Sequence, residues 1–248
     1  MYLKHFLKSL PETNKKIVSV MSGGLDSTIL THLLVRKYSA VNVLGLSFYY
    51  GQKQELELDL ARKTSNFLGI RHIELDLKIL GNITKNVSAN IQGTDLEMPT
   101  ITEVLGDPAP KTEVPFRNMI INSIAFSYAQ VNEASHVFTG LQSRDLYNYW
   151  DTTGLFITAM NHVAELNRKH KISLVAPFKD FTKAQEVELA KELGNVDFNL
   201  TLSCYNPYYG ISCGVCPTCA ERIKAFMDAG IVDPVPYLPN TTPKEWNK

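Results

Sequence analysis

No uninterrupted apolar run in the 248-residue sequence reaches the roughly 18 residues that a membrane-spanning helix needs, so we expect no membrane partner. The stretch from Met1 to Leu10 is too short, and lacks the small-residue cleavage site, for a signal peptide. The formal net charge is zero, which removes the bulk electrostatic argument for nucleic-acid binding but leaves a local basic patch open. Together these absences predict a cytosolic protein.

Cysteine is scarce as well. The chain has four cysteines, all of which follow Thr201, with the spacing Cys204-x8-Cys213-x2-Cys216-x2-Cys219. In a reducing compartment, four clustered thiols favour a metal ion over disulfides. Four thiolates suit a closed, structural, tetrahedral zinc site. An iron–sulfur cluster and four unrelated buried cysteines are the alternatives.

Short β-branched runs alternate with segments of helical periodicity. The predicted strands cover residues 16–21, 41–49, 72–75 and 136–139, and the predicted helices cover 27–37, 54–68, 118–131, 155–170, 182–193 and 220–229. This alternation predicts an α/β fold, a doubly wound, Rossmann-like parallel sheet with helices on both faces. Residues 80–115 interrupt it as an excursion or flap. We expect an ATP-binding domain at 1–200 and a small C-terminal zinc-binding subdomain at 201–248.

The segment Ser22-Gly-Gly-Leu-Asp-Ser27 joins the first strand to the first helix of this pattern. Glycines let the backbone approach phosphate oxygens, and the amides at the helix start point at the anion. Asp26 would repel bare phosphate, so we expect Mg²⁺ between them. A turn that merely needs glycine is the alternative. The loop has neither the lysine of GxxxxGK[ST] nor the GxGxxG pattern. The predicted phosphate-binding residues, which become the ATP-binding residues under the resemblance described next, are Met21, Ser22, Gly23, Gly24, Leu25, Asp26, Ser27 and Thr28.

This loop resembles the pyrophosphate loop, SGGxDS, of the family that contains GMP synthetase, NAD synthetase and tRNA lysidine synthetase. Those enzymes split ATP into AMP and pyrophosphate in order to adenylate a substrate oxygen. The resemblance implies the type of reaction and says nothing about the substrate.

Loop and cysteines together resemble the 7-cyano-7-deazaguanine synthase (QueC) family, over most of the chain from about Lys16 to Met227. The matching segments are Ser22–Ser27, Tyr50-Gly-Gln52, Val114-Pro-Phe-Arg-Asn118, Thr139-Gly140, Asp145, Tyr149-Trp-Asp151, Lys183-Ala184 and Thr201-Leu-Ser-Cys-Tyr-Asn206. The family shares the Cys-Gly-x-Cys-x-x-Cys ending, which implies zinc on all four cysteines.

The resemblance implies an ATP-dependent carbon–nitrogen ligase of queuosine biosynthesis. It would adenylate 7-carboxy-7-deazaguanine, let ammonia displace AMP to give an amide, and activate the amide again so that water is lost to the nitrile. Positioning and charge stabilisation would supply the catalysis, with Mg²⁺ bridging the phosphates. Free ammonium is the expected nitrogen source, and a homodimer is expected from the resemblance alone.

Asp26, Arg117 and Lys183 are the predicted catalytic residues. Arg117 stands at a predicted helix start, where a guanidinium can grip a carboxylate or phosphate, unless it is a plain surface arginine. The resemblance implies that Lys183 reaches the ATP phosphates, and a solvated helix lysine is the alternative.

Substrate contacts are expected from two places. Tyr50 and Gln52 end the second predicted strand, where parallel sheets bind ligands, although a simple turn also fits. Asp145 and Asp151 flank an aromatic stretch that includes Tyr149 and could hold a purine-like base, although it could equally pack on the core.

The chain departs from the family at three places. Similar proteins commonly have Tyr-Pro-Asp-Cys-Arg at Tyr149–Thr153, glycine at Phe116 and glutamate at Gln185. The first departure motivates an alternative, an enzyme of phage or antiphage context that passes the activated deazaguanine to an amine of nucleic acid or protein. A non-catalytic zinc module with a relict nucleotide fold, and sulfur transfer to tRNA, which needs a free cysteine, are further alternatives.

Overall fold

The computed structural model describes residues 2–104, 107, 109–142 and 149–239, so Asp145 lies outside the described residues. A five-stranded, fully parallel sheet runs through the centre, with the strand order β3-β2-β1-β4-β5. Its strands are β1 (Ile17–Val20), β2 (Val43–Tyr49), β3 (Arg71–Asp76), β4 (His136–Phe138) and β5 (Ser173–Val175).

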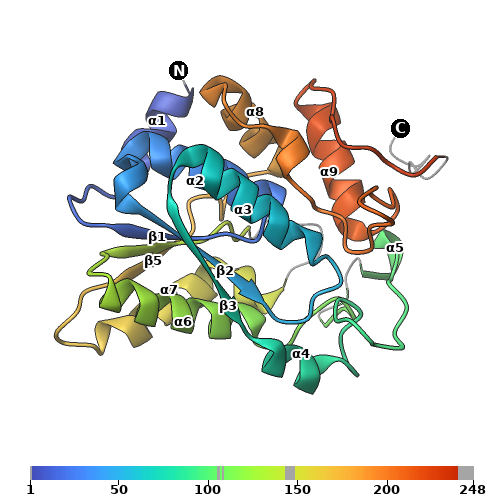
Figure 1. Cartoon of the computed structure of the whole chain (residues 1–248), viewed down its shortest axis with the longest axis horizontal. Coiled ribbons are helices and arrows are strands. Elements are labelled where there is room, and N and C mark those ends of the chain that lie inside the picture. The colour runs from blue at the N-terminus through green and yellow to red at the C-terminus, as the bar shows by residue number, and fades with distance from the viewer. Residues whose placement is uncertain (1, 105–106, 108, 143–148, 240–248) are drawn as a thin grey trace.

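Helices cover both faces of this sheet (Figure 1). The α-helices are α1 (Tyr2–Ser9), α2 (Leu25–Tyr38), α3 (Leu56–Leu68), α4 (Lys78–Thr84), α5 (Ile101–Val104), α6 (Arg117–Val131), α7 (Gly154–Glu165), α8 (Lys183–Leu193) and α9 (Pro217–Asp228). Three short 3-10 turns, η1 (Ala40–Asn42), η2 (Trp150–Thr152) and η3 (Phe198–Leu200), complete the described elements. The predicted doubly wound α/β fold is therefore confirmed.

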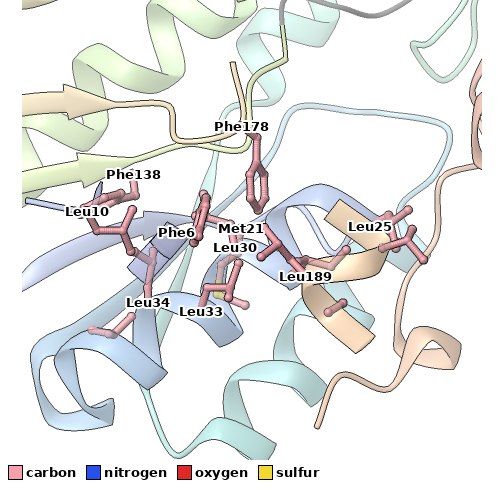
Figure 2. Close-up of a cluster of buried hydrophobic side chains, with 14 of the residues drawn as sticks. Phe6, Leu10, Met21, Leu25, Leu30, Leu33, Leu34, Phe138, Phe178 and Leu189 are labelled. Atoms are coloured by element: carbon pink, nitrogen blue, oxygen red, sulfur yellow. The ribbon is translucent and has the colours of Figure 1, made fainter. Parts of the chain in front are cut away.

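Alternating strand residues enter two separate cores, because successive side chains of a strand point to opposite faces. Ile17 belongs to the core under α1, α2, α8 and α9, whereas Val18 belongs to the core against α6 and α7. Figure 2 shows the first core, in which Phe6 of α1 and Phe178 lie beside Leu30 of α2. The rings of Phe6 and Phe178 are 5.6 Å apart, so the first helix is part of the fold.

The strand order places a topological switch between β1 and β4. The chain leaves β1 towards β2 and β3 on one side, and returns to β4 and β5 on the other. Loops at the carboxyl ends of such strands diverge and leave a crevice for ligands. The Ser22–Ser27 loop follows β1, and Thr139-Gly140 follows β4, so both lie at this crevice.

Most expected elements are confirmed with shifted ends; the helix expected at 155–170, for example, ends at Glu165. The sequence did not predict α1, whose buried Phe6 anchors it, or the short helices α4 and α5 within residues 80–115. None of the described helices has both the length and the apolar character needed to cross a bilayer. The division at residue 200 stays a prediction.

We expect truncation of a core leucine to destabilise the protein much more than truncation of a surface leucine. Leu33 of α2 is fully buried, whereas Leu155 of α7 is 79% exposed. We expect Leu33→Ala to lower the free energy of unfolding by roughly 2–5 kcal/mol, because it removes packed methyl groups and leaves a cavity. Leu155→Ala should change it by less than about 0.5 kcal/mol. Urea denaturation of both variants checks this, and equal losses would contradict the assignment of the core.

Candidate active site and metal centre

A cavity of about 240 Å³ opens at the switch between β1 and β4. Its wall is formed by the loop after β1, the end of β2, the start of α6, the start of α8 and the segment that leads to the cysteines. It brings together these predicted site residues: Met21, Ser22, Gly24, Leu25, Asp26, Ser27, Tyr50, Gln52, Arg117 and Lys183. Gly23 and Thr28 belong to the same loop and helix start but do not line the described wall.

The Ser22–Ser27 loop is held by its own side chains. Ser27 Oγ accepts the Ser22 backbone N–H at 3.2 Å and lies 3.1 Å from Ser22 Oγ, and Ser22 Oγ accepts the Gly24 N–H at 3.1 Å. Gly23 has φ +89°, and a Cβ there would lie 1.9 Å from the Glu57 carbonyl oxygen. Glycine is therefore required at 23, both by the backbone conformation and by the close approach of α3.

Asp26 and Lys183 form an ion pair inside the cavity. Lys183 Nζ lies 2.9 Å from Asp26 Oδ2, and both side chains are largely shielded from solvent. Thr182 caps α8 and forms a reciprocal capping box with Gln185, which places Lys183 at the first helical position. The departure at Gln185 therefore has a structural role, because glutamine completes the box as glutamate would. The predicted roles of Asp26 at a magnesium ion and of Lys183 at the ATP phosphates stay predictions.

Arg117 begins α6 and also lines the cavity. Its Nη1 donates to the Tyr50 hydroxyl at 3.2 Å, and its guanidinium carbon is 5.9 Å from the Tyr50 ring centroid. Burial alone would lower the pKa of this guanidinium, but the hydroxyls of Tyr50 and Tyr205 and the Asp151 carboxylate outweigh burial and raise it. Arg117 therefore stays charged and is available to an anion.

Gln52 uses its side chain for the turn after β2. Its Oε1 accepts the Tyr50 N–H at 2.9 Å, and its Nε2 donates to the Phe48 carbonyl at 3.1 Å. Gln52 thus stabilises a turn, as the alternative interpretation of this segment expected, and it also lines the cavity. Its substrate role stays a prediction.

Sequence reasoning missed Glu57, which lines the cavity from α3. A Cβ on Gly24 would lie 3.8 Å from Glu57 Oε1, so this carboxyl group faces the phosphate loop. Burial raises its pKa well above the ordinary value and Asp26 adds to the rise, while Arg117 opposes it. One sequence signal could have indicated Glu57: it lies one helical turn before Ala61, which is fully buried, and so shares the inward face of the helix.

Tyr149 and Asp151 lie outside the described lining of the cavity. Asp151 is buried, and its Oδ2 accepts the backbone N–H of Asn118 at 3.1 Å at the start of α6. The Tyr149 hydroxyl is hydrogen-bonded to Thr112, and Thr153 caps α7 by accepting the N–H of Phe156. The segment Tyr149–Thr153, which departs from the family pattern, thus stabilises the starts of α6 and α7. Substrate contacts of Tyr149 and Asp151 stay predictions.

Phe116 and Trp150, which both differ from the residues common in the family, pack against each other. Phe116 has φ +57°, a left-handed conformation that suits the glycine common at this position. Its ring lies 5.2 Å from the ring of Trp150, which in turn lies 5.7 Å from Phe156 and donates to Glu113. The left-handed conformation costs roughly 1–2 kcal/mol for a residue other than glycine, and this aromatic packing offsets part of it.

The four cysteines meet at the C-terminal segment. Their sulfur atoms all lie within 4.8 Å of one another, and Cys213 Sγ is 3.9 Å from Cys219 Sγ. A tetrahedron of thiolates about 2.3 Å from a zinc ion has edges of about 3.8 Å, so the cluster fits a metal of this size. All four are buried and none forms a disulfide, so the cluster provides a metal site.

A buried arginine ties this centre to the phosphate loop. Arg222 of α9 is almost fully buried and forms a two-pronged ion pair with Asp233, with Nε–Oδ2 2.8 Å and Nη2–Oδ1 2.9 Å. Its Nη1 also donates to Thr201 Oγ1 at 2.7 Å. Next along the chain, the Leu202 N–H donates to the Gly23 carbonyl at 3.1 Å. The metal-bearing segment and the phosphate loop are therefore joined directly.

The fold and the cavity define an α/β nucleotide-binding enzyme with an SGGxDS-type phosphate loop and a four-cysteine metal centre. The sequence model of the queuosine biosynthesis protein QueC matches residues 16–230, and the chain belongs to this family.

Similar proteins cover nearly the whole chain. The 7-cyano-7-deazaguanine synthase of Desulfatibacillum aliphaticivorans is 37% identical over 91% of this chain and 97% of its own length. That of Methanothermobacter thermautotrophicus is 35% identical over 90% of this chain and 99% of its own. The solved NH3-dependent NAD synthetase from Campylobacter jejuni covers 77% of this chain and 70% of its own at 17% identity, with a TM-score of 0.47.

The raised pKa of Glu57 predicts that the stability of the folded protein depends on pH. The pKa of Glu57 is raised in the folded protein, so above the unfolded value near 4.5 the folded protein holds a proton that the unfolded chain has released. The free energy of unfolding therefore falls as pH rises above that value. We expect Glu57→Gln to raise the melting temperature at pH 8 and to have little effect at pH 4.5. Thermal unfolding at both pH values checks this. The exposed Glu55→Gln serves as control, and a Glu57→Gln gain that does not grow with pH would contradict the burial cost.

Proposed function

We propose that this protein converts 7-carboxy-7-deazaguanine and ammonia into 7-cyano-7-deazaguanine with ATP. The observation that carries the proposal is the single cavity in which the Ser22–Ser27 loop, the Asp26–Lys183 pair and Arg117 face one another. The relatives named 7-cyano-7-deazaguanine synthase, which match almost end to end, supply the substrate class.

The phosphates of ATP would lie against the loop. The backbone amides at the start of α2, which lies at this end of the cavity, would stabilise the negative charge, aided by the helix dipole. Lys183 would place its positive charge on the departing pyrophosphate. A magnesium ion, which Asp26 would hold, supplies charge neutralisation between the phosphate oxygens.

Arg117 would hold the carboxylate that attacks the α-phosphorus. It lines the same cavity as the loop and offers a fork of N–H donors that matches a carboxylate. The Tyr50 hydroxyl, whose oxygen accepts from Arg117, would donate its proton to the substrate. Such positioning accounts for a large part of the rate in an adenylation that needs no covalent enzyme intermediate.

The reaction would proceed through two activations. The carboxylate oxygen attacks ATP and pyrophosphate leaves, then ammonia forms the carbon–nitrogen bond and AMP leaves with the carboxylate oxygen. The amide oxygen then attacks a second ATP and pyrophosphate leaves. AMP departs with the amide oxygen while the nitrogen loses both of its protons, which gives the nitrile. We propose free ammonia as the nitrogen source.

The metal in the cysteine cluster is proposed to be zinc. Four thiolates leave no coordination position for substrate, so its role would be structural. We also propose a cytosolic location, which fits four buried cysteines that remain unpaired as disulfides, and retain the homodimer as a proposal. The alternative function, transfer of the activated deazaguanine to an amine of a macromolecule, was motivated by the departure at Tyr149–Thr153. In the structure, Asp151 and Thr153 of this segment stabilise the starts of α6 and α7.

The proposed activity predicts the products of one incubation. With 7-carboxy-7-deazaguanine, ATP, magnesium and ammonium, we expect the nitrile by mass spectrometry and two AMP per nitrile. Asp26→Asn should lower pyrophosphate release by roughly 100- to 1000-fold, because it removes charge stabilisation at the phosphates. Asp59→Asn, a change on the outer side of α3, is the matched control. AMP release without nitrile would contradict the proposal.

The cysteine cluster predicts the metal content. Elemental analysis of protein purified without added metal should find one zinc and no stoichiometric iron per chain. Cys216→Ser should lose the zinc and melt at a lower temperature, because the loops between the cysteines have little apolar surface to bury. Ser212→Ala, which leaves all four thiolates in place, should keep the metal. Stoichiometric iron with the visible absorption of a cluster would contradict a zinc site.

A further inference from the structure

The C-terminal segment runs beside the phosphate loop before it reaches the first cysteine. The Leu202 N–H donates to the Gly23 carbonyl at 3.1 Å, and a Cβ on Gly24 would lie 3.5 Å from the Leu202 carbonyl oxygen. Ser203 is the next residue, and both Leu202 and Ser203 line the cavity. Ser203 therefore enters the cavity directly after the backbone that contacts the phosphate loop.

A buried guanidinium contacts Ser203. Asp233 accepts from Nε and Nη2 of Arg222, which leaves Nη1 for two hydroxyl groups. Nη1 donates to Thr201 Oγ1 at 2.7 Å and to Ser203 Oγ at 3.5 Å, the second bond being the longer and weaker. Arg222 is only 1% exposed and does not line the cavity, so it reaches a ligand there only through a neighbouring group.

The two hydroxyl groups differ in where their protons go. Each oxygen accepts from Arg222, and each hydroxyl still has one proton to donate. Thr201 Oγ1 donates its proton to the Phe198 carbonyl at 2.7 Å. The Ser203 hydroxyl has no acceptor among the described residues, although its side chain lines the cavity. The proton of Ser203 is therefore available to a ligand, whereas that of Thr201 is not.

We propose that Ser203 is a further phosphate-binding residue, whose hydroxyl donates to an oxygen of the ATP phosphates at the Ser22–Ser27 loop. Arg222 acts through Ser203 as a positioning residue. Its bond to the Ser203 oxygen orients the hydroxyl, and a hydroxyl that accepts from a guanidinium is also a stronger donor. The inference rests on the proposed function, since it takes ATP to be the anion held by the loop.

Ser203→Ala removes only the hydroxyl and tests the proposal by equilibrium binding. We expect the Kd of ATP with magnesium and the Kd of pyrophosphate, measured by calorimetry, to rise about tenfold, because each ligand loses a hydrogen bond to a charged acceptor. The Kd of 7-carboxy-7-deazaguanine should stay unchanged, because this ligand has no phosphate. Ser173→Ala, at the exposed amino end of β5, is the matched control and should leave all three values unchanged.

The pattern across the three ligands decides the outcome. Unchanged Kd values for ATP and pyrophosphate, or an equal loss for all three ligands, overturns the role of Ser203. Ser203→Thr, which keeps a hydroxyl, is the second variant and should bind ATP more tightly than Ser203→Ala; equal affinities would contradict the role of the hydroxyl. If the unmodified protein binds ATP but releases no AMP when 7-carboxy-7-deazaguanine is added, the proposed function fails while the role of Ser203 stands.

Discussion

The backbone hydrogen bond from Leu202 to Gly23 is the contact on which the geometry of the site depends. Gly23 lies at the turn of the phosphate loop, in a conformation that places its carbonyl outside the strand ladder. Leu202 begins the segment that carries all four cysteines. One bond of about 3.1 Å thus joins the anion-binding loop of the α/β domain to the metal-bearing tail. Because α3 packs within 1.9 Å of a would-be Cβ on Gly23, no other residue would let the three parts meet.

The cavity is lined by two carboxyl groups, of Asp26 and Glu57, and by two basic side chains, of Lys183 and Arg117. Of these, Asp26 and Lys183 form an ion pair. An incoming triphosphate brings several negative charges close to two carboxyl groups, so the cavity needs protons or cations to take it up. The raised pKa of Glu57 moves this carboxyl group towards the neutral form, which reduces repulsion on the loop side of the cavity.

The sequence predicted those parts of the site whose chemistry is local. The Ser22–Ser27 loop follows from glycines between a strand and a helix, and the cysteine cluster follows from spacing alone. Glu57 and Arg222 could not be predicted in the same way, because a charged residue in a helix is ordinarily solvated and only tertiary packing turns these two inward. Asp151 shows a second role that the sequence did not predict: its carboxylate accepts the Asn118 N–H at the start of α6, while the ligand contact suggested by the neighbouring aromatics stays a prediction. Its role could not be read from composition, because the partner lies 33 positions away.

The cysteine-bearing loops from Thr201 to Cys216 depend on polar and metal-binding contacts, because the tail residues that enter a core of the sheet, such as Phe226, lie in α9. Their apolar cluster beyond the cysteines consists of Leu60, Leu202 and a few half-buried neighbours, far smaller than the two cores of the sheet. Arg222 compensates by filling the interior with a charge whose donors reach Asp233, Thr201 and Ser203. A buried ion pair of this kind contributes little net stability compared with apolar packing, but it permits one arrangement of the chain where leucines would permit several. We infer that the tail is built for position more than for stability, since the residues it places, Leu202, Ser203 and Tyr205, are the ones that close the cavity over the loop.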